Sequence, residues 1–433
     1  MKRLVLSLAT VVAGPLAAQT ASPLSLDDCL QLSASRHPAL VAARAGVTAA
    51  QEAVAESRAP LYPQVDVAAG YHRWQHRAFL PAGLSLPGRS LPEVVGPLDD
   101  WNGGLTSRVL LYDAGERRAA IEAAQARRGA AEADSTATAT DLRHAVRVAF
   151  YTLAAASDVR AAADQNLSRA EAHQRLAAAR QAAGAVPRAD VIRLEAEVAS
   201  ARLQVISAES RVRLARGRLN TAMGRPAETP LEIAPSREPL TPPASGDVAA
   251  LLQRALAQRP ELAAGERRAD AARAAVAAAR AARAPRIRAD AAFGWRDTVL
   301  LPDTRDWQAG LSLEIPVFDA GSRTRRAART RADLAREEAL LEGRRLQVRD
   351  EVWSAATEVD RTWASIGAST AGVRAGEEGL RVTRERYERG AAVITDLLET
   401  QTTLARAEAA LAEARWGYLA ARASLERAVG AER

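Results

Sequence analysis

Four segments of the chain alternate apolar and polar residues with a period of two. In the clearest of them, the alternating apolar residues are Trp307, Ala309, Leu311, Leu313, Ile315 and Val317. Such alternation predicts β-strands with one apolar and one polar face. We expect strands at about residues 64–75, 101–112, 286–300 and 306–318. An ordinary half-buried sheet shows this pattern, but a length of about ten residues also suits a tilted membrane-spanning strand.

Longer segments carry apolar or small residues that step by three and four positions. One seam is Leu194, Val198, Ala201, Val205, Ala208, Val212, Ala215 and Leu219, and another is Thr400, Leu404, Ala407, Leu411, Ala414, Tyr418, Ala421 and Leu425. This spacing predicts helices packed as coiled coils. Two helices of 69 residues are expected at 115–183 and 321–389, each about 103 Å long at 1.5 Å per residue. Shorter helices are expected at 187–223 and 393–429.

The same order of elements occurs twice along the chain. Pro260 follows Pro38 by 222 residues, whereas the segments 112–115 (Tyr-Asp-Ala-Gly) and 318–321 (Phe-Asp-Ala-Gly) are 206 residues apart. Gly184 and Gly390 are also 206 residues apart. The chain is therefore a tandem duplication. The two spacings differ by 16 residues because the first copy has a Pro/Gly-rich insertion between residues 71 and 101.

The duplication sets the predicted domain organisation. Residues 1–18 have two basic residues, an apolar run and small residues before Ala18, which is typical of a secretory signal peptide. The first copy spans 19–224, a Pro-rich linker spans 225–246, the second copy spans 247–430, and 431–433 form a tail. No later stretch has the roughly 18 apolar residues of a membrane-spanning helix. We therefore expect an exported protein without a helical anchor, with the loop at 80–97 outside the cell.

Composition argues against two classes of function. The net charge is +7, but the Arg residues alternate with Glu and Asp along the helices and form no basic patch, so nucleic-acid binding is not expected.

Cys29 is the only cysteine, which excludes an intrachain disulfide. His72 and His76 fit a loop or sheet wall better than a metal site, and His144 and His173 are expected on helix surfaces. With no catalytic constellation and no cofactor motif, the sequence does not predict an enzyme.

Two carboxylates mark the turn between the last two helices. Gly390 suits the end of one helix, and Asp396 and Glu399 stand three residues apart at the start of the next, so they share one face. At the tip of a helical hairpin they could pair with cations or close an aqueous path. Acidic residues are also favoured at any helix start by the helix dipole. This stretch alone leaves both interpretations open.

Taken together, these features resemble the TolC family of outer-membrane efflux and secretion channels. Four amphipathic strands cannot close a barrel, and open strand edges cannot face lipid, so three copies with twelve strands are expected. The resemblance rests on the duplicated order of helix, Pro, strand pair, Asp-Ala-Gly and long helix, and it covers the mature chain. It implies a mainly α fold in which each protomer gives four strands to a trimeric, 12-stranded outer-membrane β-barrel and long helices to a periplasmic α-helical barrel.

The resemblance also assigns a gate. The family's acidic ring at the periplasmic entrance falls on Asp396 and on Glu399, which replaces the usual second Asp. Carboxylates that converge from three copies would concentrate cations and repel anions. Divalent or trivalent cations could plug such a ring, although no resident metal is expected.

The family's latch between hairpins is incomplete in this chain. Tyr387 matches the latch Tyr and Asp190 its acidic partner, but the latch Arg falls on Ala392. Arg193 lies opposite Glu399 by the 206-residue repeat. We expect Arg193 and Glu399 to alternate around the entrance and replace the missing bond.

The function implied by the resemblance is passive export. The homotrimer would be the outer-membrane channel of a tripartite efflux pump for small molecules, drugs or metal ions, with a periplasmic membrane-fusion adaptor, an inner-membrane pump of the RND or ABC type, and outer-membrane lipid as partners. Type I protein secretion shares the architecture and is the alternative. An exported coiled-coil scaffold is the alternative from another class, but a scaffold needs no lipid-facing strands. The cargo cannot be read from this sequence.

Overall fold

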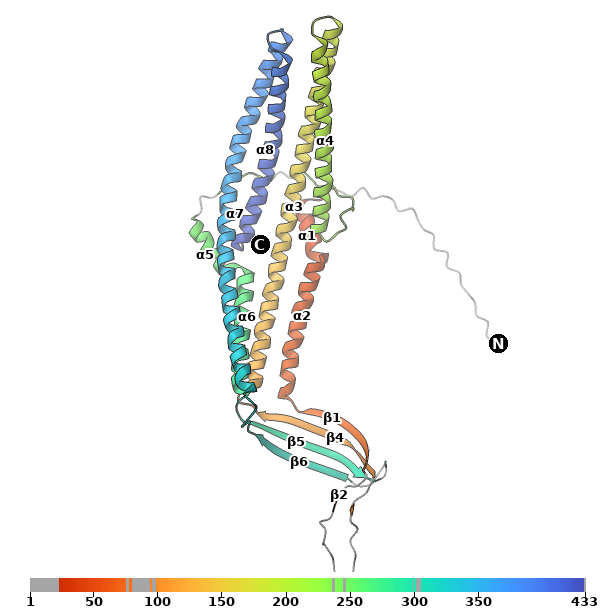
Figure 1. The fold of residues 1–433 in the computed structure, drawn as a ribbon, viewed down its shortest axis with the longest axis vertical. Coiled ribbons are helices and arrows are strands. Elements are labelled where there is room, and N and C mark those ends of the chain that lie inside the picture. The colour runs from red at the N-terminus through yellow and green to blue at the C-terminus, as the bar shows by residue number, and fades with distance from the viewer. Residues whose placement is uncertain are drawn as a thin grey trace, which may run out of the picture. The chain divides into compact units, whose positions relative to one another are not determined.

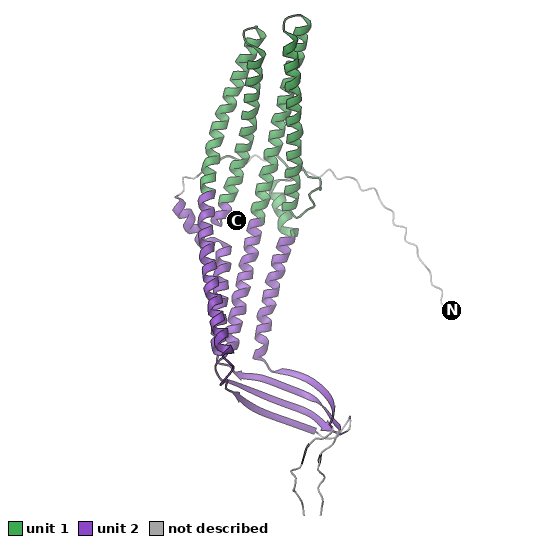
Figure 2. Ribbon diagram, in the orientation of Figure 1, with its two compact units in different colours: residues 1–37, 142–245, 355–425 green, residues 38–141, 246–354, 426–433 purple. Residues whose placement is uncertain are grey.

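The computed structural model divides into two compact units that are interleaved in sequence. It describes residues 23–74, 78–79, 94–95, 99–235, 238–243, 247–298, 300 and 305–431. Unit 1 contains residues 1–37, 142–245 and 355–425, and unit 2 contains residues 38–141, 246–354 and 426–433 (Figure 2). The predicted signal peptide, His76 and most of the predicted outer loop lie outside the described residues. Each unit thus draws residues from both copies of the duplication.

Helices make up most of the described chain (Figure 1). They are α1 (Leu26–Arg36), α2 (Pro38–Arg58), α3 (Glu116–Ala182), α4 (Arg188–Ala222), α5 (Val248–Gln258), α6 (Pro260–Ala281), α7 (Ser322–Glu388) and α8 (Ile394–Val429), with a 3₁₀ turn η1 (Ala59–Leu61). The breaks before Pro38 and Pro260 arise because proline disfavours helical angles in the residue before it. His37 and Arg259 accordingly have extended ψ values of 126° and 124°.

The main sheet has four antiparallel strands in the order β1-β4-β5-β6. They are β1 (Gln64–Arg73), β4 (Asp99–Tyr112), β5 (Arg286–Asp297) and β6 (Arg305–Glu314). The last strand ends four residues before the expected limit, because Pro316 has no N–H to donate and restricts the residue before it. Two short strands that the sequence did not predict, β2 (Ala78–Phe79) and β3 (Val94–Val95), pair within the insertion of the first copy.

The sheet joins the two copies of the duplication at its centre. There β4 pairs with β5, and Gly104 lies opposite Gly294. A Cβ built on Gly294 would overlap the carbonyl oxygen of Gly103, so only glycine allows this close approach. The outer strand β6 has large apolar side chains in the open, with Trp307 73% and Leu311 75% exposed. The apolar face of β6 is therefore exposed in the described part of the chain.

The Asp-Ala-Gly segments start the two long helices in the same way. Asp113 accepts hydrogen bonds from the N–H groups of Gly115 at 3.1 Å and Arg117 at 2.9 Å. Asp319 accepts the equivalent bonds from Gly321 at 3.1 Å and Arg323 at 2.9 Å. Asp113 and Asp319 therefore cap the starts of α3 and α7.

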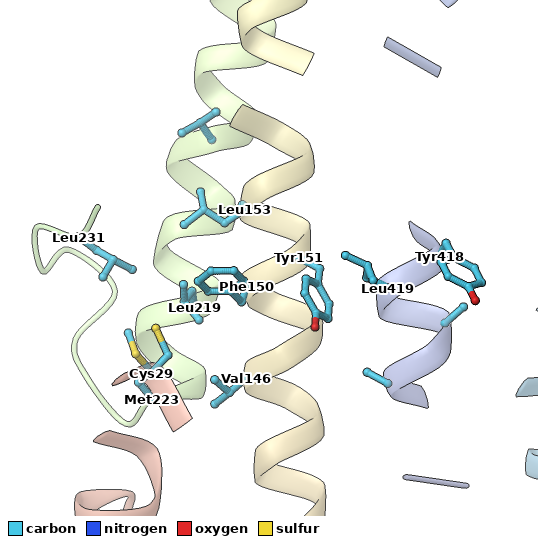
Figure 3. Packing of buried hydrophobic residues seen from close by; sticks show 14 of the residues in the cluster. Cys29, Val146, Phe150, Tyr151, Leu153, Leu219, Met223, Leu231, Tyr418 and Leu419 are labelled. Atoms are coloured by element: carbon cyan, nitrogen blue, oxygen red, sulfur yellow. The ribbon is translucent and has the colours of Figure 1, made fainter. Parts of the chain in front are cut away.

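Unit 1 has its core where both copies and the linker meet. Figure 3 shows Phe150 and Tyr151 of α3 between residues of α4 and α8, with the free Cys29 beside Met223. Tyr151 donates to Glu238 at 2.7 Å and Tyr418 donates to the carbonyl of Thr241 at 2.6 Å. The Pro-rich linker is thus bound to the helices by buried tyrosines. In the same core, burial raises the pKa of the Cys29 thiol to about 11.

Candidate gate at the helical hairpin tips

The two helical hairpins of unit 1 turn with the same backbone geometry. Gly184, after α3, has φ +73°, and Gly390, after α7, has φ +75°. The N–H of Ala185 donates to the carbonyl of Arg180 at 2.9 Å, and the N–H of Ala391 donates to the carbonyl of Arg386 at 2.8 Å. These are the bonds of a glycine-terminated helix end. The α3–α4 and α7–α8 turns lie at the same end of unit 1 (Figure 1).

An apolar cluster from four helices joins the tips of the hairpins. Its buried members are Ala177 of α3, Leu194 of α4, Tyr387 of α7, and Ile394 and Leu397 of α8. Each is at most 6% exposed. The cluster holds the predicted latch residue Tyr387 in place within one chain.

The structure brings Tyr387 and Asp190 near each other without a hydrogen bond between them. Burial raises the pKa of Tyr387, and the negative charge of Asp190 raises it further, whereas Arg180 lowers it. The hydroxyl is buried and has no hydrogen-bond partner among the described residues. Nη1 of Arg193 lies 4.0 Å from Oδ1 of Asp190, and the Arg193 side chain is 56% exposed. The latch role of Tyr387, Asp190 and Arg193 therefore stays a prediction.

Replacing Tyr387 by Phe is expected to leave the free energy of unfolding unchanged or to raise it by about 1 kcal/mol, because the change removes a buried, unpaired hydroxyl. Tyr151→Phe is the matched control, since it loses the bond to Glu238 and should cost about 1 kcal/mol. Denaturant unfolding followed by circular dichroism measures both. A marked loss of stability in the Tyr387 variant would show that the hydroxyl is paired in the assembled protein.

Arg180 is a further tip residue that the sequence did not single out. Its guanidinium donates to the carbonyl of Tyr387 at 3.3 Å and to that of Glu388 at 2.5 Å. It also lies 5.7 Å from the centre of the Tyr387 ring, within the range of a cation–π contact. Arg180 of hairpin α3–α4 thus caps the end of α7 in the other hairpin. A basic residue in the last turn of α3 was visible in the sequence, but its target was not.

The predicted ring residues Asp396 and Glu399 lie exposed in the first turns of α8. Among the described residues, neither carboxylate takes part in a hydrogen bond or ion pair with another side chain. Among the described residues, Arg193 forms no ion pair with Glu399 and pairs with Asp190 instead. The two carboxylates are therefore free to face solvent, cations or another copy.

A buried polar layer lies farther from the tips. Gln401, with no exposed surface, donates to Asn166 at 3.2 Å, and Asn166 donates to Gln204 at 3.4 Å. The expectation that His173 lies on a helix surface is wrong, because it is only 9% exposed. Burial lowers its pKa, and Arg384 lowers it further, so the ring is neutral at pH 7. The heptad pattern did not reveal these polar interior residues.

The described residues lack two other features, a metal-binding cluster and a membrane-spanning helix. No group of three or more His, Cys, Asp or Glu side chains there is placed to hold a metal ion. None of the helices that the structure describes is long and apolar enough to cross a membrane. His72 of β1 is exposed and stacks on Trp74, with ring centres 6.0 Å apart.

Comparison with known proteins identifies the family. Residues 29–225 and 251–431 match the outer membrane efflux protein family. The chain belongs to this family. The resemblance to TolC-type channels is therefore confirmed, and with it a mainly helical fold with a four-stranded antiparallel sheet. Among curated proteins, no match is found.

Solved structures of membrane proteins share the fold. The outer-membrane channel OprN is 24% identical, with a TM-score of 0.83 over 94% of this chain and 90% of that chain. A membrane protein from Pseudomonas aeruginosa is 25% identical, with a TM-score of 0.82 over 94% and 93%. The open state of the Neisseria gonorrhoeae channel MtrE is 23% identical, with a TM-score of 0.77 over 94% and 88%.

Membership in the outer membrane efflux protein family fixes the membrane in which the protein works. The protein is an outer-membrane efflux channel that spans into the periplasm. Its sheet is the part suited to the membrane, because β6 exposes large apolar side chains. The family is one of transport conduits, which favours a channel over the scaffold interpretation.

Proposed function

We propose that this chain is the outer-membrane conduit of a tripartite efflux pump and that it works as a homotrimer. It would export small molecules, drugs or metal ions, received from an inner-membrane pump of the RND or ABC type through a periplasmic adaptor. The conduit is passive, and the pump supplies both energy and choice of cargo.

The observation that carries this proposal is the pair of open sheet edges. Strands β1 and β6 each have only one partner among the described strands. An open edge in lipid leaves backbone N–H and C=O groups unpaired, which costs several kcal/mol for each group. Pairing β6 of one copy with β1 of the next removes every edge. Three copies give twelve strands, a number that suits an outer-membrane barrel.

The duplication predicts the register of that pairing. Within the chain, β4 of the first copy pairs with β5 of the second, and Ser107 lies opposite Ala291. Position 107 corresponds to Leu313 by the 206-residue repeat, and position 291 corresponds to Ala69 by the 222-residue repeat. If the joint between copies repeats the joint within the chain, Leu313 lies opposite Ala69 of the next copy.

Cysteine pairing tests the register. In a Cys29→Ser background, Leu313→Cys combined with Ala69→Cys is expected to form disulfides between copies on oxidation, because directly opposed residues in a sheet have suitable Cα separations. Denaturing gels would then show covalent dimers and trimers.

The matched control moves one cysteine by a single residue. Leu313→Cys with Ala68→Cys places the two thiols on opposite faces, so it should give little cross-linking. Equal cross-linking in both variants would refute the register.

A monomer in native mass spectrometry of the detergent-extracted wild type would overturn the trimer itself.

At the hairpin tips, we propose that Asp396 and Glu399 form the acidic ring of the periplasmic gate. Their exposure and their lack of side-chain partners among the described residues support this role. Arg193, which is more than half exposed, is available to alternate with Glu399 of a neighbouring hairpin. Exposed ion pairs contribute only about 0–1 kcal/mol each, so several such pairs would have to act together.

A further inference from the structure

Arg180 joins the two hairpins of one chain through backbone atoms. It stands two residues before the end of α3 and donates to the carbonyls of the last two residues of α7, Tyr387 and Glu388. Carbonyls at a helix C-terminus carry partial negative charge and lack partners within the helix, so a guanidinium binds them well. This contact requires only the end of a helix beside an Arg.

The duplication repeats every part of this contact. Arg386 follows Arg180 by 206 residues and stands two residues before the end of α7. The carbonyls of Gln181 and Ala182 end α3 as those of Tyr387 and Glu388 end α7. Arg386 is exposed, and its side chain makes one long hydrogen bond of 3.4 Å, to Ala391 in its own turn. Gln181 and Ala182 are exposed as well.

We propose that Arg386 caps the end of α3 in a neighbouring copy of the chain. Arg180 uses the face of hairpin α7–α8 that meets hairpin α3–α4 of the same chain. In a closed ring, the other face of hairpin α7–α8 meets hairpin α3–α4 of the next copy. Arg386 occupies on α7 the position that Arg180 occupies on α3. The repeat therefore places it on the face of hairpin α7–α8 that meets the next copy. This inference rests on the proposed trimer and adds to it a collar of six arginine caps around the tips.

The two kinds of joint differ in strength. At the joint within the chain, Arg180 also meets the ring of Tyr387. At the joint between copies, the repeat puts Gln181 in the place of Tyr387 and Ala182 in the place of Glu388. The cap of Arg386 therefore lacks the cation–π contact and the nearby carboxylate. The three Arg386 contacts between copies are therefore weaker than the three Arg180 contacts within chains. When the gate opens, the hairpin tips separate between copies first.

A chemical cross-link tests the geometry. In a Cys29→Ser background, Arg386→Cys with Ala182→Cys, treated with a short bis-maleimide, is expected to yield covalent dimers and trimers. Arg384→Cys with Ala182→Cys is the matched control, because Arg384 is exposed and lies two positions before Arg386, on the opposite side of α7. Equal yields in the two variants, or none in the first, would overturn the collar.

Conductance in planar bilayers tests the effect on the gate. Arg386→Ala should raise the resting open fraction by about tenfold, the effect of losing about 1.4 kcal/mol of charge-assisted hydrogen bonding. Arg386→Lys should restore part of the closure, and Arg389→Ala, which removes the same charge, should change little. An equal rise in the two alanine variants would show a general charge effect and refute the cap.

Native mass spectrometry separates this proposal from the one on which it rests. A stable trimer that shows neither the cross-link nor the change in conductance refutes the collar and leaves the trimeric conduit intact. A protein that remains monomeric in detergent refutes the conduit first.

Discussion

Replacing Asp396 and Glu399 together by Ala is expected to enlarge the resting conductance of the purified protein and to weaken its preference for cations. Both carboxylates are exposed at the start of α8 and have no side-chain partner among the described residues. Charges from three copies that converge on one constriction attract cations and repel anions there. Planar-bilayer recordings with a salt gradient measure conductance and selectivity together.

The same recordings test cation plugging and the role of Arg193. Millimolar divalent cations should reduce the current of the wild type and have little effect on the double variant. Arg193→Ala should raise the current if Arg193 alternates with Glu399. Glu413→Ala removes an exposed charge from the same helix, α8, far from the tip and should behave as wild type. Unchanged currents in the double variant would leave Asp396 and Glu399 as ordinary helix-start charges.

Replacing Arg259 by Leu is expected to lower the free energy of unfolding of unit 2 by about 3–5 kcal/mol, the usual cost of removing one partner from a buried ion pair. Arg259 is 3% exposed and donates to Glu351 at 2.5 Å and to Glu261 at 3.0 Å. Arg427 bonds the same two carboxylates at 2.9 and 3.3 Å. Without Arg259, two partly buried carboxylates share one cation.

Denaturant unfolding measures this loss, with Arg118→Ala, also in unit 2, as the control. Arg118 pairs with Glu122 on the surface, where both side chains are more than half exposed, so its removal should cost less than about 1 kcal/mol. A loss in the Arg259 variant no larger than in the control would show that Arg427 alone satisfies the cluster.

The cluster also predicts how stability depends on pH. Burial raises the pKa of Glu351, but the hydrogen bond and charge of Arg259, with Arg427, bring it below its ordinary value of 4.5. A carboxyl with a depressed pKa contributes stability above the unfolded-state pKa, and this contribution is lost as the pH falls through the folded-state pKa. The wild type should therefore lose more stability than Arg259→Leu as the pH falls below about 4.5.

The sequence predicted the elements well because their signals are local. The seam of α4 is buried at Leu194, Val198, Ala201, Ala208, Val212, Ala215 and Leu219, as the heptad pattern indicated. In α8 the predicted seam residues Leu404, Tyr418 and Ala421 are buried, but near the tip Gln401 is buried in place of the predicted Thr400. The pattern missed Gln401 because it counts as polar, although Asn166 supplies its partner from another helix.

The tip was harder to predict because its contacts join distant parts of the chain. Tyr387, Asp396 and Glu399 were assigned their roles only through resemblance to the family, and these roles stay predictions. Arg180 was missed because no sequence feature near position 180 indicates that the end of α7 lies beside it. His173 was placed on the surface because a single His in an Ala-rich helix gives no sign of which neighbours cover it.

The central pairing of the sheet has a consequence for the order of folding. Leu105 of β4 pairs with Phe293 of β5, so 188 residues separate two strands that must meet. The pairs β1–β4 and β5–β6 close over much shorter distances in sequence and can form first. Until β5 arrives, the inner edge of β4 is open and able to pair with other chains. During export, the first half of the protein is therefore the part that most needs protection from aggregation.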